Sequence, residues 1–78
     1  MRPTLDEVAA EVARFAPGAP ATVPLEADLV QDLGYDSVRL VELFILIGDR
    51  FGLELPIDDI LGGPALTVRG LARHAGAT

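Results

Sequence analysis

Three stretches of the chain place apolar residues at the three- and four-residue spacing of an amphipathic helix. The first spans residues 5–15, the second begins at Ser37 and ends near Phe51, and the third spans residues 68–75. Each stretch predicts a helix that turns one apolar face toward a shared core. The core positions are Leu5, Val8, Ala9, Val12 and Phe15, then Leu40, Leu43, Phe44, Ile47 and Phe51, then Val68, Leu71, Ala72 and Ala75.

Residues that favour helix ends flank all three stretches. Thr4 and Glu7 have the spacing of a capping box, in which each side chain accepts a hydrogen bond from the other residue's backbone amide. Asp36 and Thr67 are suitable N-caps for the second and third helices. The predicted stops are Pro17-Gly18, Gly52 and Gly76.

The connections between these helices set the fold. Residues 16–35 form a long loop with three prolines, and we expect a short helical turn near Ala27–Leu29 within it. Ile57 to Leu61 has room for one or two helical turns before Gly62-Gly63-Pro64 breaks the chain. The prediction is an all-α, small antiparallel four-helix bundle of three main helices and one short helix, in one domain of residues 1–78. The apolar residues expected to hold the long loop on the bundle are Leu25, Leu29, Val30 and Leu33.

The helix that starts at Ser37 has three faces on an ideal helical wheel. One is the core face. A second carries the charged residues and should face water, and a third lies beside Ser37, outside the core. Gly48 leaves a shallow spot in that third face. The charged residues are Arg39, Glu42, Asp49 and Arg50, and the apolar residues beside Ser37 are Val38, Val41 and Ile45.

Charge is concentrated in the middle of the chain. The formal net charge is −6, and the segment from Glu26 to Asp59 holds nine acids against two arginines. Binding to nucleic acid needs basic residues opposite the phosphates, so this balance argues against a nucleic-acid partner. It favours protein partners with a basic docking surface, although an acidic surface also serves simply to keep a small protein soluble.

Several residue types are absent or rare. There is no cysteine, which excludes disulfides and thiolate metal sites. The first seven residues have no apolar run after their single basic residue, so we expect no signal peptide. No segment approaches the length of a membrane span, so we expect a cytoplasmic protein without membrane contact. All six basic residues are arginine, which suggests a GC-rich bacterial genome.

Covalent chemistry, if the chain has any, points to Ser37, its only serine. Ser37 follows Asp32-Leu33-Gly34-Tyr35-Asp36 and precedes Val38, with Leu40-Val41-Glu42-Leu43 one residue further on. This string resembles the attachment motif of acyl and peptidyl carrier proteins. The resemblance implies that the Ser37 hydroxyl accepts 4'-phosphopantetheine from coenzyme A, and that Asp36 helps to position the metal of the modifying enzyme. It also supplies a precedent for the long first loop.

The same resemblance implies the protein's partners. They would be a phosphopantetheinyl transferase and enzymes that load, transfer or condense acyl groups, while the chain itself would be no enzyme and would act as a monomer. The family docks its partners on the second helix, which here implicates Val38, Val41, Glu42 and Ile45. Carrier proteins of fatty-acid synthesis have a strongly acidic second helix, whereas this one has two acids and two arginines. The departure favours a discrete acyl carrier of a polyketide or related secondary-metabolite pathway.

Other functions stay open at this point. One is a peptidyl or aminoacyl carrier of a nonribosomal peptide pathway, and another is an unmodified helical interaction module in which Ser37 only begins a helix. A serine hydrolase would pair Ser37 with His74, but the Gly-x-Ser-x-Gly turn is missing, so we expect no catalytic residue. Asp58, Asp59 and His74 match no known ligand spacing, so we expect no metal.

Overall fold

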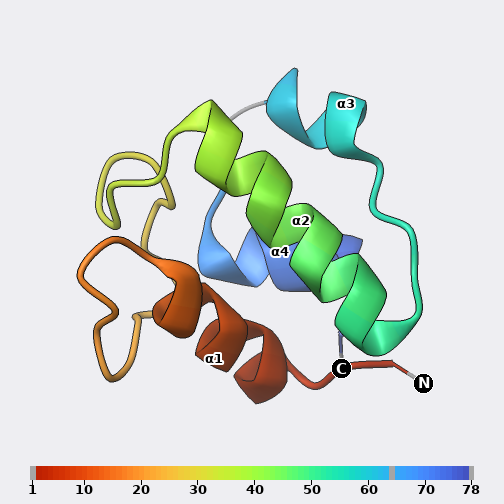
Figure 1. The fold of residues 1–78 in the computed structure, drawn as a ribbon, viewed down its shortest axis with the longest axis horizontal. Helices are drawn as coiled ribbons and strands as arrows, with labels where there is room; N and C mark the ends of the chain where they lie inside the picture. The colour runs from red at the N-terminus through yellow and green to blue at the C-terminus, as the bar shows by residue number, and fades with distance from the viewer. Residues whose placement is uncertain (1, 64, 78) are drawn as a thin grey trace.

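Four helices make up the computed structural model, which describes residues 2–63 and 65–77. Within these residues there is no β-strand, so the predicted all-α bundle with a long first loop is confirmed. In Figure 1, α1 and α2 run antiparallel and α4 passes behind α2. Among the described helices, short α3 makes its close backbone approach to α2. The helices are α1 (Leu5–Phe15), α2 (Ser37–Phe51), α3 (Ile57–Leu61) and α4 (Val68–His74).

The predicted helix ends are confirmed in their local chemistry. The Thr4 hydroxyl accepts from the Glu7 amide at 3.1 Å and the Glu7 carboxylate accepts from the Thr4 amide at 2.9 Å, which completes the capping box. Gly52 ends α2 in the left-handed conformation. Gly76, also left-handed with φ of 72°, follows α4 in a Schellman arrangement, with the amides of Gly76 and Ala77 bonded back into the last turn. Pro64, part of the predicted break after α3, lies outside the described residues.

The three apolar stripes converge as predicted, but four of the predicted core residues are only half-buried. Leu5, Ala9 and Phe15 sit half-buried at the edge of the core, and so does Phe51, which was expected inside the stripe of α2. Phe51 lies in the last turn of α2, where the guanidinium of Arg50 lies 5.6 Å from the centre of its ring. The other predicted core residues are buried: Val8, Val12, Leu40, Leu43, Phe44, Ile47, Val68, Leu71, Ala72 and Ala75.

The long loop is held by its backbone as well as by apolar side chains. Its residues pair with the segment that enters α4. The Leu29 amide donates to Leu66 at 2.9 Å, the Val68 amide to Ala27 at 3.1 Å, and Asp28 forms an isolated antiparallel bridge with Thr67. The turn predicted near Ala27–Leu29 forms slightly later in the chain: the Asp32 amide bonds to the Asp28 carbonyl at 2.9 Å, and residues 29–33 have turn conformation without forming a helix. Leu29 is buried and Leu25 and Leu33 are half-buried, but Val30 is 46% exposed and anchors nothing.

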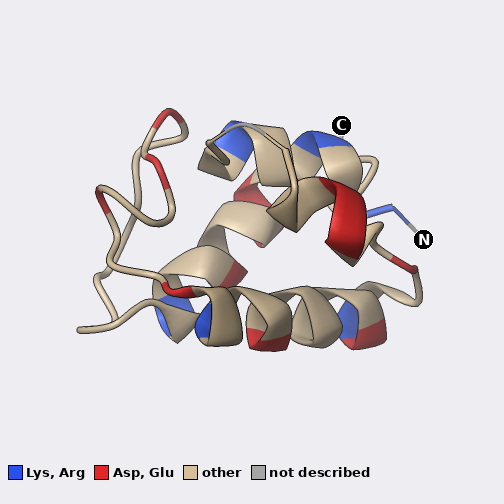
Figure 2. Ribbon diagram, turned by 90° about the horizontal axis from the view of Figure 1, so that it is seen from above, with Lys and Arg blue, Asp and Glu red and all other residues tan. Residues whose placement is uncertain are grey.

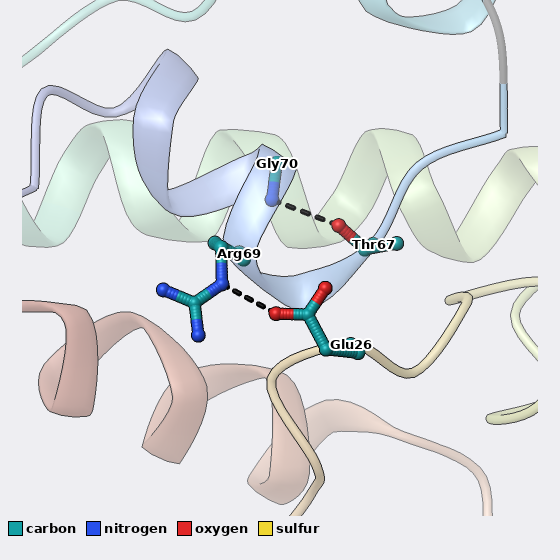
Figure 3. Close-up of polar contacts among 4 residues, drawn as sticks. All are labelled: Glu26, Thr67, Arg69 and Gly70. Atoms are coloured by element: carbon teal, nitrogen blue, oxygen red, sulfur yellow. Dashed lines mark hydrogen bonds and ion pairs between the residues drawn. The ribbon is translucent and has the colours of Figure 1, made fainter.

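Side chains add to the junction between loop and α4. Figure 3 shows Thr67 capping α4 by accepting from the Gly70 amide at 3.0 Å, and Arg69 reaching across to the carboxylate of Glu26 in the loop. In Figure 2 the loop between α1 and α2 carries acidic positions and no basic ones. The loop therefore brings an acidic surface to the end of the bundle where α2 begins.

Candidate functional site

Ser37 is the first residue of α2 and is exposed. Asp36, just before it, is the N-cap: its carboxylate accepts from the Arg39 amide at 2.8 Å and its backbone carbonyl accepts from the Leu40 amide at 2.9 Å. The predicted cap is thus confirmed, together with the position of Ser37 in the first turn. The serine hydroxyl is presented at the helix end, where the backbone amides of Ser37 and Val38 have no acceptor within the helix.

Such a helix start favours a negatively charged group bound to the serine. The amides at the beginning of a helix carry partial positive charge and can donate to phosphate oxygens. The carboxylate of Asp36 accepts from the Arg39 amide, and its carbonyl accepts from the Leu40 amide. The amides of Ser37 and Val38 are left to donate to such a group. The site can therefore hold a phosphate ester of Ser37.

The turn before Ser37 is fixed by Tyr35, which sequence reasoning did not single out. Tyr35 is 2% exposed, its amide donates to Leu29 at 2.9 Å and its hydroxyl donates to the Val12 carbonyl in α1 at 2.7 Å. Burial raises the pKa of the Tyr35 hydroxyl to about 12, and the nearby positive charge of Arg39 opposes that rise. A sequence signal existed: Tyr35 and Leu40 hold the two positions of a hydrophobic staple around the Asp36 cap, and both are buried.

Arg39 lies on the other side of Ser37, and its predicted place on the wet face is wrong. Its guanidinium donates to the carbonyl of Phe15 at 2.9 Å and lies 5.2 Å from the centre of the Phe15 ring. Arg50 likewise turns toward α1, where it lies 3.3 Å from the carboxylate of Glu11. Both arginines of α2 therefore point to α1. The two exposed acids of α2, Glu42 and Asp49, form no ion pair with them.

The predicted docking residues lie along α2 from Ser37 onward. Val38 is 69% exposed and Ile45 is 60% exposed, Glu42 is exposed, and Val41 is half-buried. Ser37, Val38, Val41 and Glu42 line one shallow hollow. Ile45 lies further along α2 and lines a second hollow with residues of both α1 and α2, which are Phe15, Glu42, Leu46 and Asp49. An apolar surface with an acidic rim thus extends from Ser37 along α2.

The residues of the rejected alternatives do not join this site. His74 is exposed at the end of α4, and Asp58 and Asp59 are exposed on α3. Over residues 2–63 and 65–77 no group of three His, Cys, Asp or Glu side chains is arranged to hold a metal ion. In the same part of the chain no helix has the length and apolar character to cross a membrane.

Comparison with known proteins identifies the family. Residues 3–75 match the family model described as "Phosphopantetheine attachment site". The chain belongs to this phosphopantetheine attachment family. Among curated proteins it is similar to acyl carrier proteins of Helicobacter acinonychis (50% identical over 36 residues, 46% of each chain) and Campylobacter hominis (40% over 38 residues, 49% of this chain and 48% of the relative).

A third relative extends the similarity over more of the chain. The acyl carrier protein of Campylobacter jejuni subsp. doylei is 36% identical over 56 residues, which are 72% of this chain and 73% of that protein. The chain spans only about half the length of the first two relatives. No solved structure matches the chain significantly.

Proposed function

We propose that this protein is an acyl carrier protein that holds acyl intermediates on a 4'-phosphopantetheine group attached to Ser37. The observation that carries the proposal is the position of the chain's only serine, exposed as the first residue of α2 directly after the N-cap residue Asp36. Membership of the phosphopantetheine attachment family supports phosphopantetheine as the attached group. The similar proteins are acyl carrier proteins, which favours acyl over aminoacyl cargo.

The residues around Ser37 fit a phosphopantetheine group. The exposed hydroxyl can be reached by a modifying enzyme, and the first amides of α2 favour the phosphate. The hollow formed with Val38 and Val41 offers an apolar surface to the arm. In the attachment step the Ser37 oxygen forms a bond to phosphorus, the pyrophosphate bond of coenzyme A breaks, and the adenosine bisphosphate half leaves. The serine proton passes to a base on the transferase.

The bound group supplies a terminal thiol that holds the acyl chain as a thioester. The protein's own part is to present the arm and to dock each partner in turn, so it acts as a carrier and not as a catalyst. Tethering keeps the intermediate at high effective concentration near the docked enzyme. The expected partners are a phosphopantetheinyl transferase and enzymes that load, transfer or condense acyl groups.

The docking surface consists of Val38, Val41, Glu42 and Ile45. The large exposed fractions of Val38 and Ile45 are unfavourable in water unless a partner covers these side chains. We assign the protein to a polyketide or related secondary-metabolite pathway, because α2 offers apolar contacts and only two exposed acids, Glu42 and Asp49. Partners should therefore be selected more by apolar fit than by charge.

Intact-mass measurement tests the attachment. The protein is incubated with coenzyme A and a transferase of broad specificity, and we expect a single gain of about 340 Da, the mass of one phosphopantetheinyl group. Ser37→Ala should gain nothing while its circular dichroism and melting curve match those of the wild type. Modification of the alanine variant, or none of the wild type, would contradict the proposal.

A competition between condensing enzymes tests the pathway. The same malonyl-loaded protein is offered to a condensing enzyme of fatty-acid synthesis and to one of polyketide synthesis. We expect faster turnover with the polyketide enzyme. Equal or faster turnover with the fatty-acid enzyme would contradict the pathway assignment and leave the carrier role intact.

A further inference from the structure

Two residues before Ser37 and two residues after it, a side chain reaches the last turn of α1. Tyr35 lies two residues before it and donates to the carbonyl of Val12 at 2.7 Å, and Arg39 lies two residues after it and donates to the carbonyl of Phe15 at 2.9 Å. These are contacts across 23 and 24 residues of sequence, so they depend on the packing of α2 against α1.

The acceptors explain why the contacts form. Val12 and Phe15 lie in the last turn of α1. Phe15 is its last residue, so the Phe15 carbonyl has no donor within the helix, and Arg39 supplies one. The Val12 carbonyl accepts from the Ala16 amide and takes the Tyr35 hydroxyl as a second donor. Arg39 adds a cation–π contact with the Phe15 ring at 5.2 Å. The end of α1 and the beginning of α2 thus stabilise each other.

Ser37 itself is exposed, so its own side chain is not held by packing. Its position depends on the residues at both sides: the buried Tyr35 fixes the approach of the chain, and the half-buried Arg39 fixes the first turn of the helix. The carboxylate of Asp36 acts within this frame, since it caps the amide of Arg39.

We propose that Tyr35 and Arg39 are positioning residues for modification at Ser37. By joining both flanks of Ser37 to α1, they keep the serine and the first turn of α2 in the conformation that a phosphopantetheinyl transferase binds. The inference rests on the proposed attachment at Ser37 and adds residues that act on the reaction without touching the reacting atoms.

The expected effect on the transferase kinetics follows from the fraction of carrier molecules that have the competent conformation. When only a fraction of the carrier has the competent conformation, the apparent affinity of the transferase for it falls by that fraction. Once bound, the competent conformer reacts as before. Loss of either contact should therefore raise the KM for the carrier and leave kcat nearly constant, whereas damage to the reacting groups would lower kcat.

The test uses steady-state modification kinetics with the whole chain, coenzyme A and a broad-specificity transferase. Tyr35→Phe removes one hydroxyl, Arg39→Met removes the guanidinium but keeps an unbranched apolar stem, and Arg39→Lys keeps a charged donor. Arg73→Met, an exposed arginine of α4, is the matched control. We expect Tyr35→Phe and Arg39→Met each to raise KM by roughly 3- to 10-fold with kcat within about two-fold. Arg39→Lys should recover part of the loss, and Arg73→Met should match the wild type.

Amide hydrogen exchange gives a readout that a general loss of stability would not reproduce. In the two positioning variants, exchange at the amides of Arg39 and Leu40, which bond to Asp36, should quicken relative to the amides of α4. Unchanged KM in folded variants, or exchange that quickens equally throughout, would overturn the inference. If Arg39→Met does not fold, Tyr35→Phe and Arg39→Lys decide the question alone. A wild type that is not modified at Ser37 would instead contradict the proposed function.

Discussion

The carboxylate of Glu11 in α1 lies 3.3 Å from the guanidinium of Arg50 in α2, and the Glu11 side chain is only 3% exposed. A second arginine, Arg14, lies 3.7 Å from the same oxygen. The other carboxylate oxygen of Glu11 is buried with no hydrogen-bond partner among the described residues. This ion pair joins α1 to the last turn of α2, the end of the helix opposite Ser37.

Removal of the two partners should have unequal effects. Arg50→Met leaves a buried carboxylate with only its more distant partner, and should lower the free energy of unfolding by about 1–3 kcal/mol. Glu11→Leu removes the buried charge and returns the half-exposed Arg50 to water, so it should be neutral or stabilising. Urea denaturation of both variants at one pH measures the difference. A greater loss for Glu11→Leu would show that the pair stabilises the fold outright.

Asp36 allows its structural and chemical roles to be separated. Asp36→Ala should lower the free energy of unfolding by about 1 kcal/mol through loss of the cap, whereas asparagine is an equally good cap and Asp36→Asn should not. If the carboxylate also helps to position the transferase's metal, Asp36→Asn should still slow modification of Ser37. Thermal melts and intact-mass time courses test both expectations, and normal modification of the asparagine variant would limit Asp36 to capping.

The core of α2 should depend more on Phe44 than on Phe51. Phe44 is 1% exposed, so Phe44→Ala should cost about 3–5 kcal/mol, a large share of the stability of so small a domain. Phe51 is half-buried, and its truncation should cost only about 1–3 kcal/mol. Chemical denaturation compares the two. Equal losses would mean that Phe51 packs more deeply in solution than the structure has it.

High pH should destabilise the protein through Tyr35. Its pKa is raised from 10.0 to about 12 in the folded state, so the folded protein keeps a proton that the unfolded chain has lost. The resulting stabilisation is complete below about pH 10 and disappears as the pH rises to about 12, a loss of about 2–3 kcal/mol. Lysine, the other residue type whose ordinary pKa lies in this interval, is absent from the chain.

Tyr35→Phe is the control for this pH dependence. Its stability should change little between pH 10 and 12, when urea midpoints are measured across the interval. Because Tyr35 is the only tyrosine and there is no tryptophan, the tyrosinate absorbance of the wild type reports its ionisation directly. A midpoint close to that of free tyrosine would refute the burial argument. Arg39→Met should move the midpoint upward, because the opposing positive charge is lost.

The docking surface should separate transfer from folding. Ile45 is 60% exposed, so Ile45→Arg should cost less than about 1 kcal/mol while slowing acyl transfer by the cognate enzyme. Val41 is half-buried, so Val41→Asp should cost more stability than Ile45→Arg. Melting temperature and transfer rate are compared for each variant. Unchanged transfer by a folded Ile45→Arg protein would remove Ile45 from the docking surface.

The sequence was sufficient for features that depend on nearby residues. Helix ends at Thr4, Asp36 and Thr67 follow from side chains that bond amides three residues away, and the apolar stripes follow from helical periodicity. Ser37 could be selected because it is unique and directly follows a good cap.

Contacts between distant residues could not be predicted in the same way. Arg39 and Arg50 fall on the polar side of an isolated helix, and only the packing of α1 beside α2 brings them to Phe15 and Glu11. One sign was present: Glu11 stands three residues after Val8 and four before Phe15, on the apolar side of its helix. An acid at that spacing indicates a buried charge that needs a partner.

The pairing of the long loop with the entry to α4 also bears on the order in which the protein folds. The amides of Leu29, Val68 and Arg69 bond to carbonyls about 40 residues away in the sequence, so these bonds are non-local and form late in folding. We therefore expect the middle of the long loop and the entry to α4 to become ordered together, in one of the last steps of folding, while the contacts of Tyr35 with α1 can form before them.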